Sequence, residues 1–195
     1  MENKINSTMK EIPNYTLDIY KNIFENSFDG ILLIDNNFRH IDANQSACSI
    51  LGYSKDELNN MGLRDIVTKN GIEYGKMLWK ELLEKGSQKG EYKLLTKDGK
   101  EINIEYHALA NIEPGIHLFF MKDITEKKKI ELNMLKEREM WFTILNDLPV
   151  YICIQDPDRE IVFANKNLEE NFGPIEGRKC HEIFFGNKDK TKEPC

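Results

Sequence analysis

Several features that would place this chain in a familiar class are missing from its sequence. No apolar run approaches roughly 18 residues, the length that a membrane-spanning helix needs, so we expect no membrane span. The first residues, MENKINSTMKEIPNY, contain no apolar segment of the kind that directs secretion. The chain has only 4 cysteines and no Cys-x-x-Cys pair, which favours reduced thiols and a cytoplasmic location.

Basic charge and catalytic motifs are also lacking. The 27 Lys and Arg residues are outnumbered by 33 Asp and Glu residues, giving a net charge of −6. No basic stripe is available to meet phosphates, so nucleic acid is not an expected partner. The sequence has no glycine-rich phosphate loop, no Gly-x-Ser-x-Gly motif, and none of the sequence boxes of a histidine kinase or a cyclase. We therefore expect no enzyme activity from these 195 residues.

What the chain does contain is an internal repeat. At one constant offset, Asp35, Ala43-Asn44 and Gly52 recur as Asp156, Ala164-Asn165 and Gly173. A turn, a strand and a helix start that are used twice indicate a duplicated module. The chain carries one full copy of this module and the start of another.

The first copy has a readable order of elements. Apolar spacing and turn residues predict a helix at 17–26, strands at 31–34 and 38–42, helices from Asn44 and from Ser54, a helical turn near 63–67, a longer helix across 72–83, and strands at 91–96, 101–109 and 116–122. Strict alternation is clearest over residues 101–109, and residues 116–121 are apolar enough for a central strand. The sequence therefore predicts an α+β fold, with one antiparallel sheet and short helices packed on one face.

A different pattern follows. Residues 124–148 contain no Gly or Pro, and the apolar residues Ile130, Met134, Trp141, Ile144 and Leu148 fall on steps of three and four. They predict a helix of about six turns, which either pairs with its own copy as a short coiled coil or packs on its own domain as a charged linker. Strands at 151–155 and 161–164 and a helix at 165–172 then begin the second copy. Because two strands leave exposed edges and half a core, we expect the chain to be part of a longer protein or a truncated gene product.

Specific residues resemble a known family. The matching pieces are Phe24–Ile31, the Ile41–Asn44 junction, Leu51–Leu58, Lys97–Gly99 and Met121–Glu126. On these motifs residues 17–125 resemble a PAS domain of the sensory-box type, and residues 141–195 resemble the first half of a second one. The resemblance implies a five-stranded antiparallel sheet, a cavity between sheet and helices, dimerisation, and a signal that leaves through the helix after Asp-Ile-Thr.

The resemblance sets the expected organisation and function. We expect a polar tail at 1–16, a PAS domain at 17–125, a signalling helix at 126–148, and the N-terminal half of a second PAS domain at 149–195. The chain then reads as the input region of a two-component protein such as a sensor histidine kinase, which senses a small ligand or a partner. One alternative is a module that only dimerises, with no ligand. Another is metal or redox sensing by the second module.

Candidate ligand and relay residues follow from this reading. The residues expected to face a cavity for a small apolar or aromatic molecule are Ile50, Leu63, Trp79, Leu94, Tyr106, Phe119 and Met121, although the same side chains also suit a filled core. At the exit of the sheet, Asp123 is expected to accept a hydrogen bond from the sheet edge and Thr125 to cap the following helix.

Cofactor candidates are few. Haem-binding PAS domains commonly use a His on the long helix, and none occurs over residues 71–85, so haem is not expected. Light-sensing flavin PAS domains carry an Asn-Cys-Arg-Phe stretch that this chain lacks, and Cys48 reads as a small buried side chain. Cys180, His181 and Cys195 would suit a metal or redox site, but as three widely spaced ligands they equally suit ordinary reduced thiols.

Overall fold

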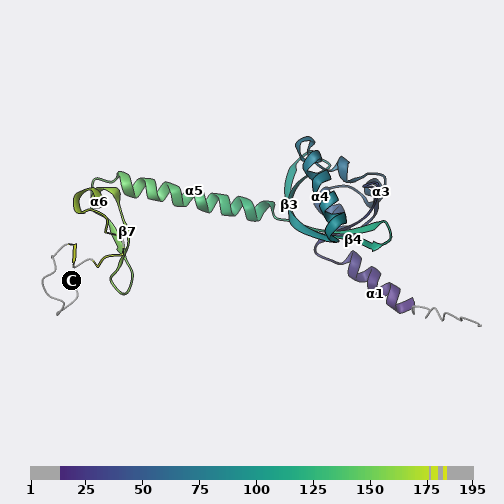
Figure 1. The fold of residues 1–195 in the computed structure, drawn as a ribbon, viewed down its shortest axis with the longest axis horizontal. Helices are drawn as coiled ribbons and strands as arrows, with labels where there is room; N and C mark the ends of the chain where they lie inside the picture. Colours follow the sequence, from purple (N-terminus) through teal and green to yellow (C-terminus); the bar gives the residue numbers. More distant parts are fainter. Residues whose placement is uncertain (1–13, 176, 180–181, 184–195) are drawn as a thin grey trace, which may run out of the picture. The chain divides into compact units, whose positions relative to one another are not determined.

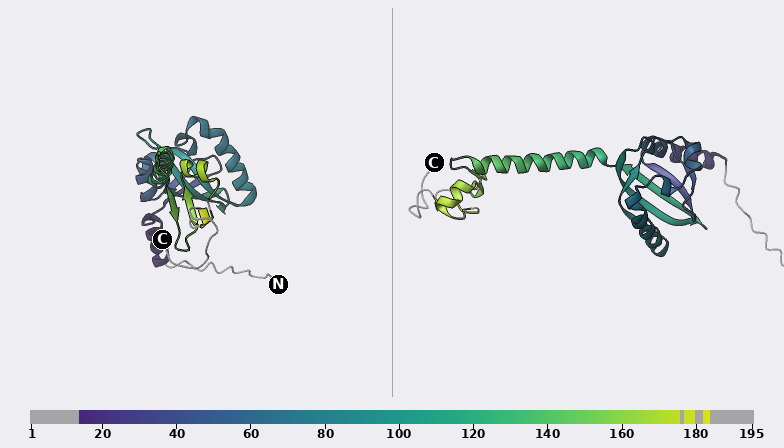
Figure 2. Two further views of the ribbon diagram at one scale, coloured as in Figure 1. Left: turned by 90° about the vertical axis from the view of Figure 1, so that its left-hand side faces the viewer. Right: turned by 90° about the horizontal axis from the view of Figure 1, so that it is seen from above.

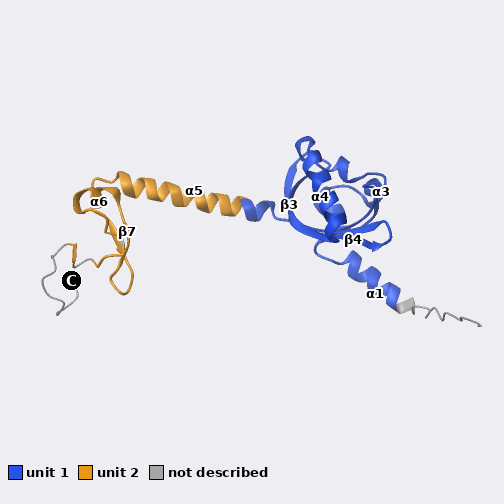
Figure 3. Cartoon of the chain, in the orientation of Figure 1, with its two compact units in different colours: residues 1–128 blue, residues 129–195 orange. Residues whose placement is uncertain are grey.

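The computed structural model describes residues 14–175, 177–179 and 182–183. Their contacts divide the chain into two compact units, residues 1–128 and 129–195 (Figure 3). Each unit has its own antiparallel sheet. Within the part of the chain that is described, no helix combines the length and the apolar character that crossing a bilayer requires.

The first unit contains the elements that the sequence pattern predicts (Figure 1). They are α1 (Asn14–Glu25), β1 (Gly30–Asp35), β2 (His40–Ala43), α2 (Gln45–Leu51), α3 (Lys55–Asn59), two 3-10 turns η1 (Leu63–Asp65) and η2 (Lys69–Gly71), α4 (Ile72–Lys85), β3 (Ser87–Leu95), β4 (Glu101–Glu113) and β5 (Ile116–Asp123). The long helix α5 (Thr125–Asp147) starts directly after β5.

The sheet of the first unit has the strand order β2-β1-β5-β4-β3. The predicted central strand β5 pairs with β1 on one side and β4 on the other, so the five-stranded antiparallel sheet is confirmed. The helices between β2 and β3 cover one face of this sheet (Figure 2), where their apolar side chains and those of the strands form a single core. The antiparallel sheet with helices on one face is the one that the strand pattern predicts, and its five strands are those that the PAS resemblance implies.

Local sequence signals explain where the short helices begin and end. Asn44 caps α2 by accepting a hydrogen bond from the N–H of Ala47, and Gly52 ends the helix in the left-handed region with φ 78°. Ser54 and Glu57 form a reciprocal capping box at the start of α3. All of these groups lie within a few residues of their partners, so the sequence alone predicts them.

The second strand is shorter than predicted. The Asp35 carboxylate accepts hydrogen bonds from the N–H groups of Asn37 and Arg39, at 2.8 and 2.9 Å, and this closes a turn. Phe38 lies in that turn with φ 67°, so β2 begins only at His40. The turn directs the ring of Phe38 onto Trp79, with ring centroids 4.5 Å apart.

The second unit is smaller. It contains most of α5, followed by the hairpin β6 (Cys153–Gln155) and β7 (Ile161–Ala164) and the short helix α6 (Lys166–Phe172). Ile161, Leu168 and Ile175 form its buried core. This unit has the two strands and the short helix that the sequence predicts for the start of a second copy.

Candidate functional site

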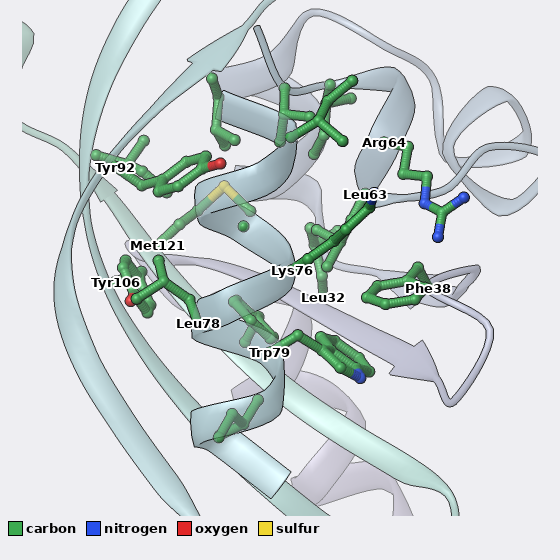
Figure 4. A pocket seen from close by; sticks show the side chains of 18 of the residues that line it. Leu32, Phe38, Leu63, Arg64, Lys76, Leu78, Trp79, Tyr92, Tyr106 and Met121 are labelled. Carbon is green, nitrogen blue, oxygen red and sulfur yellow. The ribbon is translucent and has the colours of Figure 1, made fainter. Parts of the chain in front are cut away.

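A cavity of about 90 Å³ lies between the inner face of the first sheet and α4 (Figure 4). Side chains from every strand except β2 contribute to its wall, together with η1 and the turn before β2. Its lining residues are Leu32, Phe38, Leu63, Arg64, Ile66, Val67, Ile72, Gly75, Lys76, Leu78, Trp79, Leu82, Gln88, Tyr92, Leu94, Ile104, Tyr106, Phe119 and Met121. The wall is predominantly hydrocarbon and aromatic, as in most small-molecule sites.

Six of the residues expected to face a cavity lie in this wall. They are Leu63, Trp79, Leu94, Tyr106, Phe119 and Met121. Ile50 is not among the lining residues; its Cδ1 lies beside Gly30, 3.2 Å from where a Cβ on that glycine would stand. Whether the other six bind a ligand stays a prediction.

Aromatic rings make up much of the cavity wall. Trp79 contacts Phe38, and it lies parallel to Phe119 with centroids 6.4 Å apart. The Tyr106 ring stacks on Phe119 with centroids 6.0 Å apart. The sequence analysis missed Phe38 because the turn, and not strand alternation, directs its side chain inward.

The two phenols of the wall already have protein partners. Tyr92 donates its hydroxyl hydrogen to the carbonyl of Gly71, and Tyr106 donates to Oε1 of Gln88 at 3.2 Å. Burial raises the pKa of Tyr106 to about 12 and also raises the pKa of Tyr92. Both phenols are therefore neutral near pH 7, and neither leaves a donor free for a ligand.

The two cations of the wall, Arg64 and Lys76, make different contacts. Arg64 lies on the Phe38 side of the cavity, with its guanidinium 5.0 Å from that ring centroid and turned away from Met121 (Figure 4). Lys76 pairs with Glu73 at 2.6 Å. The interior thus offers mainly apolar contact.

His117 is a fully buried residue behind Trp79, whose ring it meets edge-on at 4.8 Å. Its Nε2 donates to Oδ1 of Asn36 at 2.9 Å, while Nδ1 accepts from the N–H of Asn111 at 3.2 Å. One neutral tautomer, with the proton on Nε2, satisfies both bonds. Burial lowers the pKa of His117, which favours this neutral form.

The junction between β5 and α5 differs in detail from the prediction. Thr125 does not cap the helix; its Oγ1 accepts a hydrogen bond from the backbone N–H of Asn103 in β4, at 2.8 Å. Asp123 faces the helix start instead, where its Oδ1 accepts from the N–H of Thr125 at 2.8 Å. Each side chain thus makes the kind of contact that was predicted for the other, because Thr125 lies close enough to β4 to bond to its backbone. A Lys128–Glu91 ion pair further ties the first turn of α5 to β3.

The candidate metal or redox residues Cys180, His181 and Cys195 lie outside the described residues. Among the residues that are described, no group of three or more His, Cys, Asp or Glu side chains is arranged to hold a metal ion. Cys48 is buried on α2, and burial raises the pKa of its thiol.

Comparison with known proteins identifies the family. The family model for the PAS domain matches residues 29–126 and 149–195, which together are most of the chain. This chain belongs to the PAS domain family. Its two matched segments correspond to the complete PAS module and the partial PAS module of the structure.

Curated relatives and a solved structure agree with this assignment. The PAS chain is 32% identical over 149 residues to sporulation kinase E of Bacillus subtilis, covering 76% of this chain and 20% of that protein. It is 30% identical over 128 residues to the sensor histidine kinase TmoS of Ectopseudomonas mendocina, covering 60% of this chain and 13% of TmoS. The crystal structure of a PAS domain from Colwellia psychrerythraea aligns with a TM-score of 0.53 at 24% identity, over 57% of this chain and 98% of that domain. The chain therefore spans a fifth or less of the curated relatives that it matches.

Proposed function

We propose that this chain is the sensory input region of a signalling protein, with the relatives pointing to a histidine kinase as the output. In this proposal the cavity of the first PAS module takes up a small molecule, and α5 carries the change onward. A cytoplasmic location and pairing of two chains belong to the same proposal.

The observation that carries the proposal is the closeness of cavity and exit along the same strands. Phe119 and Met121 of β5 line the cavity, and Asp123 at the end of the same strand bonds to the start of α5. On β4 the lining residue Ile104 directly follows Asn103, whose N–H and carbonyl both bond to the start of α5. A ligand that displaces Ile104 or Met121 therefore acts one or two residues from Asn103 or Asp123, which bond to the start of α5.

The cavity chemistry selects the class of ligand. A water molecule needs two to four polar partners, and the hydroxyls of Tyr92 and Tyr106 are already bonded within the protein, so a neutral apolar molecule suits this mainly apolar space better than water or an ion. An engineered apolar cavity of about 150 Å³ holds benzene or xenon. A cavity of about 90 Å³ fits a hydrocarbon smaller than benzene, or a benzene-sized one if a wall side chain moves.

Uptake of xenon and of C3–C6 hydrocarbons by the purified chain tests this proposal. We expect binding to raise the melting temperature and to shift the resonances of Met121 and Leu82, because a ligand that binds only the folded state stabilises it. Leu63→Phe fills the cavity and should abolish the effect, whereas Leu118→Phe, a matched change on β5 outside the cavity wall, should leave it intact. Equal responses from both variants would contradict binding in this cavity.

A second function, assembly without a ligand, is favoured by the exposed apolar side chains of α5. Ile130, Met134 and Trp141 are 57, 66 and 57% exposed, and they lie on the predicted seam. Exposed apolar residues at this spacing suit a helix that pairs with its own copy. A purified chain that is dimeric, and that neither contains nor takes up any small molecule, would favour assembly over sensing.

A further inference from the structure

The charged side chains that line the cavity of the first module all carry the same sign. Among the described lining residues these are Arg64 of η1 and Lys76 of α4, and no Asp or Glu is included. Acidic residues outnumber basic ones in the whole chain, 33 to 27, so the wall departs from the composition of the protein. The charge of the wall therefore favours an anion over a cation.

Both cations keep their charged ends toward solvent although they line the cavity. Arg64 is an exposed residue, and the Lys76 side chain is 49% exposed. Long basic side chains lay their apolar stems along apolar surface and hold the charged head in water. The two heads thus mark the border between η1 and α4 at which the apolar interior meets solvent, and we call Arg64 and Lys76 the cationic rim.

The guanidinium of Arg64 is held in place by an aromatic ring. It lies 5.0 Å from the centroid of Phe38, a residue of the cavity wall that packs on Trp79 (Figure 4). The carboxylate of the next residue, Asp65, is directed to its own turn, where Oδ2 accepts a hydrogen bond from the N–H of Gly62 at 2.8 Å. The contact with Phe38 positions the charge without neutralising it, and the planar fork of N–H groups suits a carboxylate in a bidentate pair.

The second cation of the rim has a partner that a ligand can replace. Nζ of Lys76 lies 2.6 Å from Oε1 of Glu73, which is three residues earlier on α4 and whose side chain is 81% exposed. Exposed pairs at this spacing add little stability and are screened by salt. A carboxylate at the rim therefore binds Lys76 at a small cost in lost contacts.

We propose that the cavity takes a short-chain monocarboxylate, with its alkyl tail among the apolar side chains and its carboxylate on the cationic rim. The proposal rests on the ligand uptake described under Proposed function, and it adds the polar head of that ligand. A space of about 90 Å³ is smaller than the one that holds benzene, so we expect a tail of about five carbons or fewer.

The cost of burying charge keeps the head at the rim. In the apolar interior a carboxylate would lose its hydration without gaining a partner, because the hydroxyls of Tyr92 and Tyr106 are already bonded within the protein. At the rim it keeps part of its hydration and meets two cations. An alcohol of the same length gains no ion pair there, and an alkylammonium is repelled.

Probes that share one tail and differ in the head test this order. Pentanoate, 1-pentanol and pentylammonium are titrated into the whole chain near pH 7 and followed by NMR, and n-pentane reports on the tail alone. At about 0.05 M salt we expect pentanoate to bind at least about fivefold more tightly than 1-pentanol, and pentylammonium to bind more weakly than the alcohol. Salt at about 0.5 M should reduce these differences, because it screens partly exposed charges.

Variants of the rim test which residues hold the head. Arg64→Met and Lys76→Met remove the charge and keep an unbranched stem, and each should lower the ratio of pentanoate to 1-pentanol affinity by at least about twofold. This ratio cancels any change in the fit of the shared tail. Arg64→Lys keeps the charge without the planar fork and should retain part of the ratio. Lys80→Met is the matched control, since Lys80 lies on the same helix outside the cavity wall and pairs with Glu84 at 3.8 Å, and it should leave the ratio unchanged.

The outcomes separate this proposal from the one on which it rests. Equal affinity for pentanoate and 1-pentanol in the parent chain, or a ratio that survives in the double variant of Arg64→Met with Lys76→Met, would overturn the cationic rim. Pentanoate binding that persists in Leu63→Phe would also overturn it, because the filled cavity has no room for the tail. Uptake of n-pentane without a preference for pentanoate would leave the sensing proposal intact, whereas failure of all four probes to bind would refute both.

Discussion

Replacing Asn44 by Ala should be among the most damaging single changes in the first module. The change leaves two backbone N–H groups and two carbonyls without a partner at a site where Asn44 is fully buried. Each unpaired buried group costs about 1–3 kcal/mol, so the upper bound is about 12 kcal/mol. Because water and small backbone shifts can satisfy some of these groups, we expect a loss of about 3–5 kcal/mol in the free energy of unfolding, at the high end for single substitutions.

Urea unfolding followed by tryptophan fluorescence measures this loss. Trp79 lies in the first module and Trp141 in α5, so a Trp141→Phe background leaves a single reporter on the first module. Asn26→Ala is the control, because Asn26 makes one exposed bond to the carbonyl of Asn22, and its loss should cost under about 0.5 kcal/mol. A cost below about 1 kcal/mol for Asn44→Ala would refute the view that this side chain joins α1, β1 and α2.

Three further outcomes are expected. Burial lowers the pKa of His40, whose Nε2 has no partner, so the contribution of His40 to stability should be complete above the unfolded pKa of about 6.5 and should fall as the pH drops below it. Urea unfolding midpoints measured from pH 7.5 to 5.5 should therefore depend less on pH in His40→Leu. The dependence that is left should have the same sign, because burial also lowers the pKa of His117. Gly30→Ala should cost about 1–3 kcal/mol in a thermal melt, because its Cβ would lie 2.7 Å from Cγ of Met121 and 3.0 Å from the backbone of α2; an unchanged melt would show that these neighbours yield freely. Ile130→Glu should shift the chain from dimer toward monomer in light scattering at micromolar concentration, and an unaltered mass would argue against pairing through α5.

The sequence was most informative where partners are close along the chain. The caps at Asn44 and Ser54, the alternation of β4 and the turn at Asp35 each depend on residues within a few positions, and each appears in the structure. The order of the elements along the chain followed from the same local patterns. These features are encoded by short-range spacing.

Features that depend on long-range geometry were less accessible. Ile50 shares the apolar character of the cavity residues, but only the packing of α2 on β1 shows that it lies by Gly30. The exchange of roles between Asp123 and Thr125 depends on how near β4 runs to the helix start, which no local pattern reports. Phe38 was predicted in a strand but lies in a turn, because the Asp35 carboxylate binds the N–H groups of Asn37 and Arg39 on either side of it.

The two copies of the module have diverged in how their N-terminal helices are anchored. In the first copy Lys55 pairs with Glu25 of α1 at 3.0 Å and with Asp42 of β2 at 2.8 Å. In the second copy uncharged residues, Asn146 and Phe163, occupy the places of those two carboxylates. Ionic strength should therefore act unequally on the duplicates, since salt screens a partly exposed ion pair and hardly affects an amide bond or a ring contact. Duplication has thus supplied one N-terminal helix whose anchoring depends on the surrounding electrolyte and another whose anchoring hardly does.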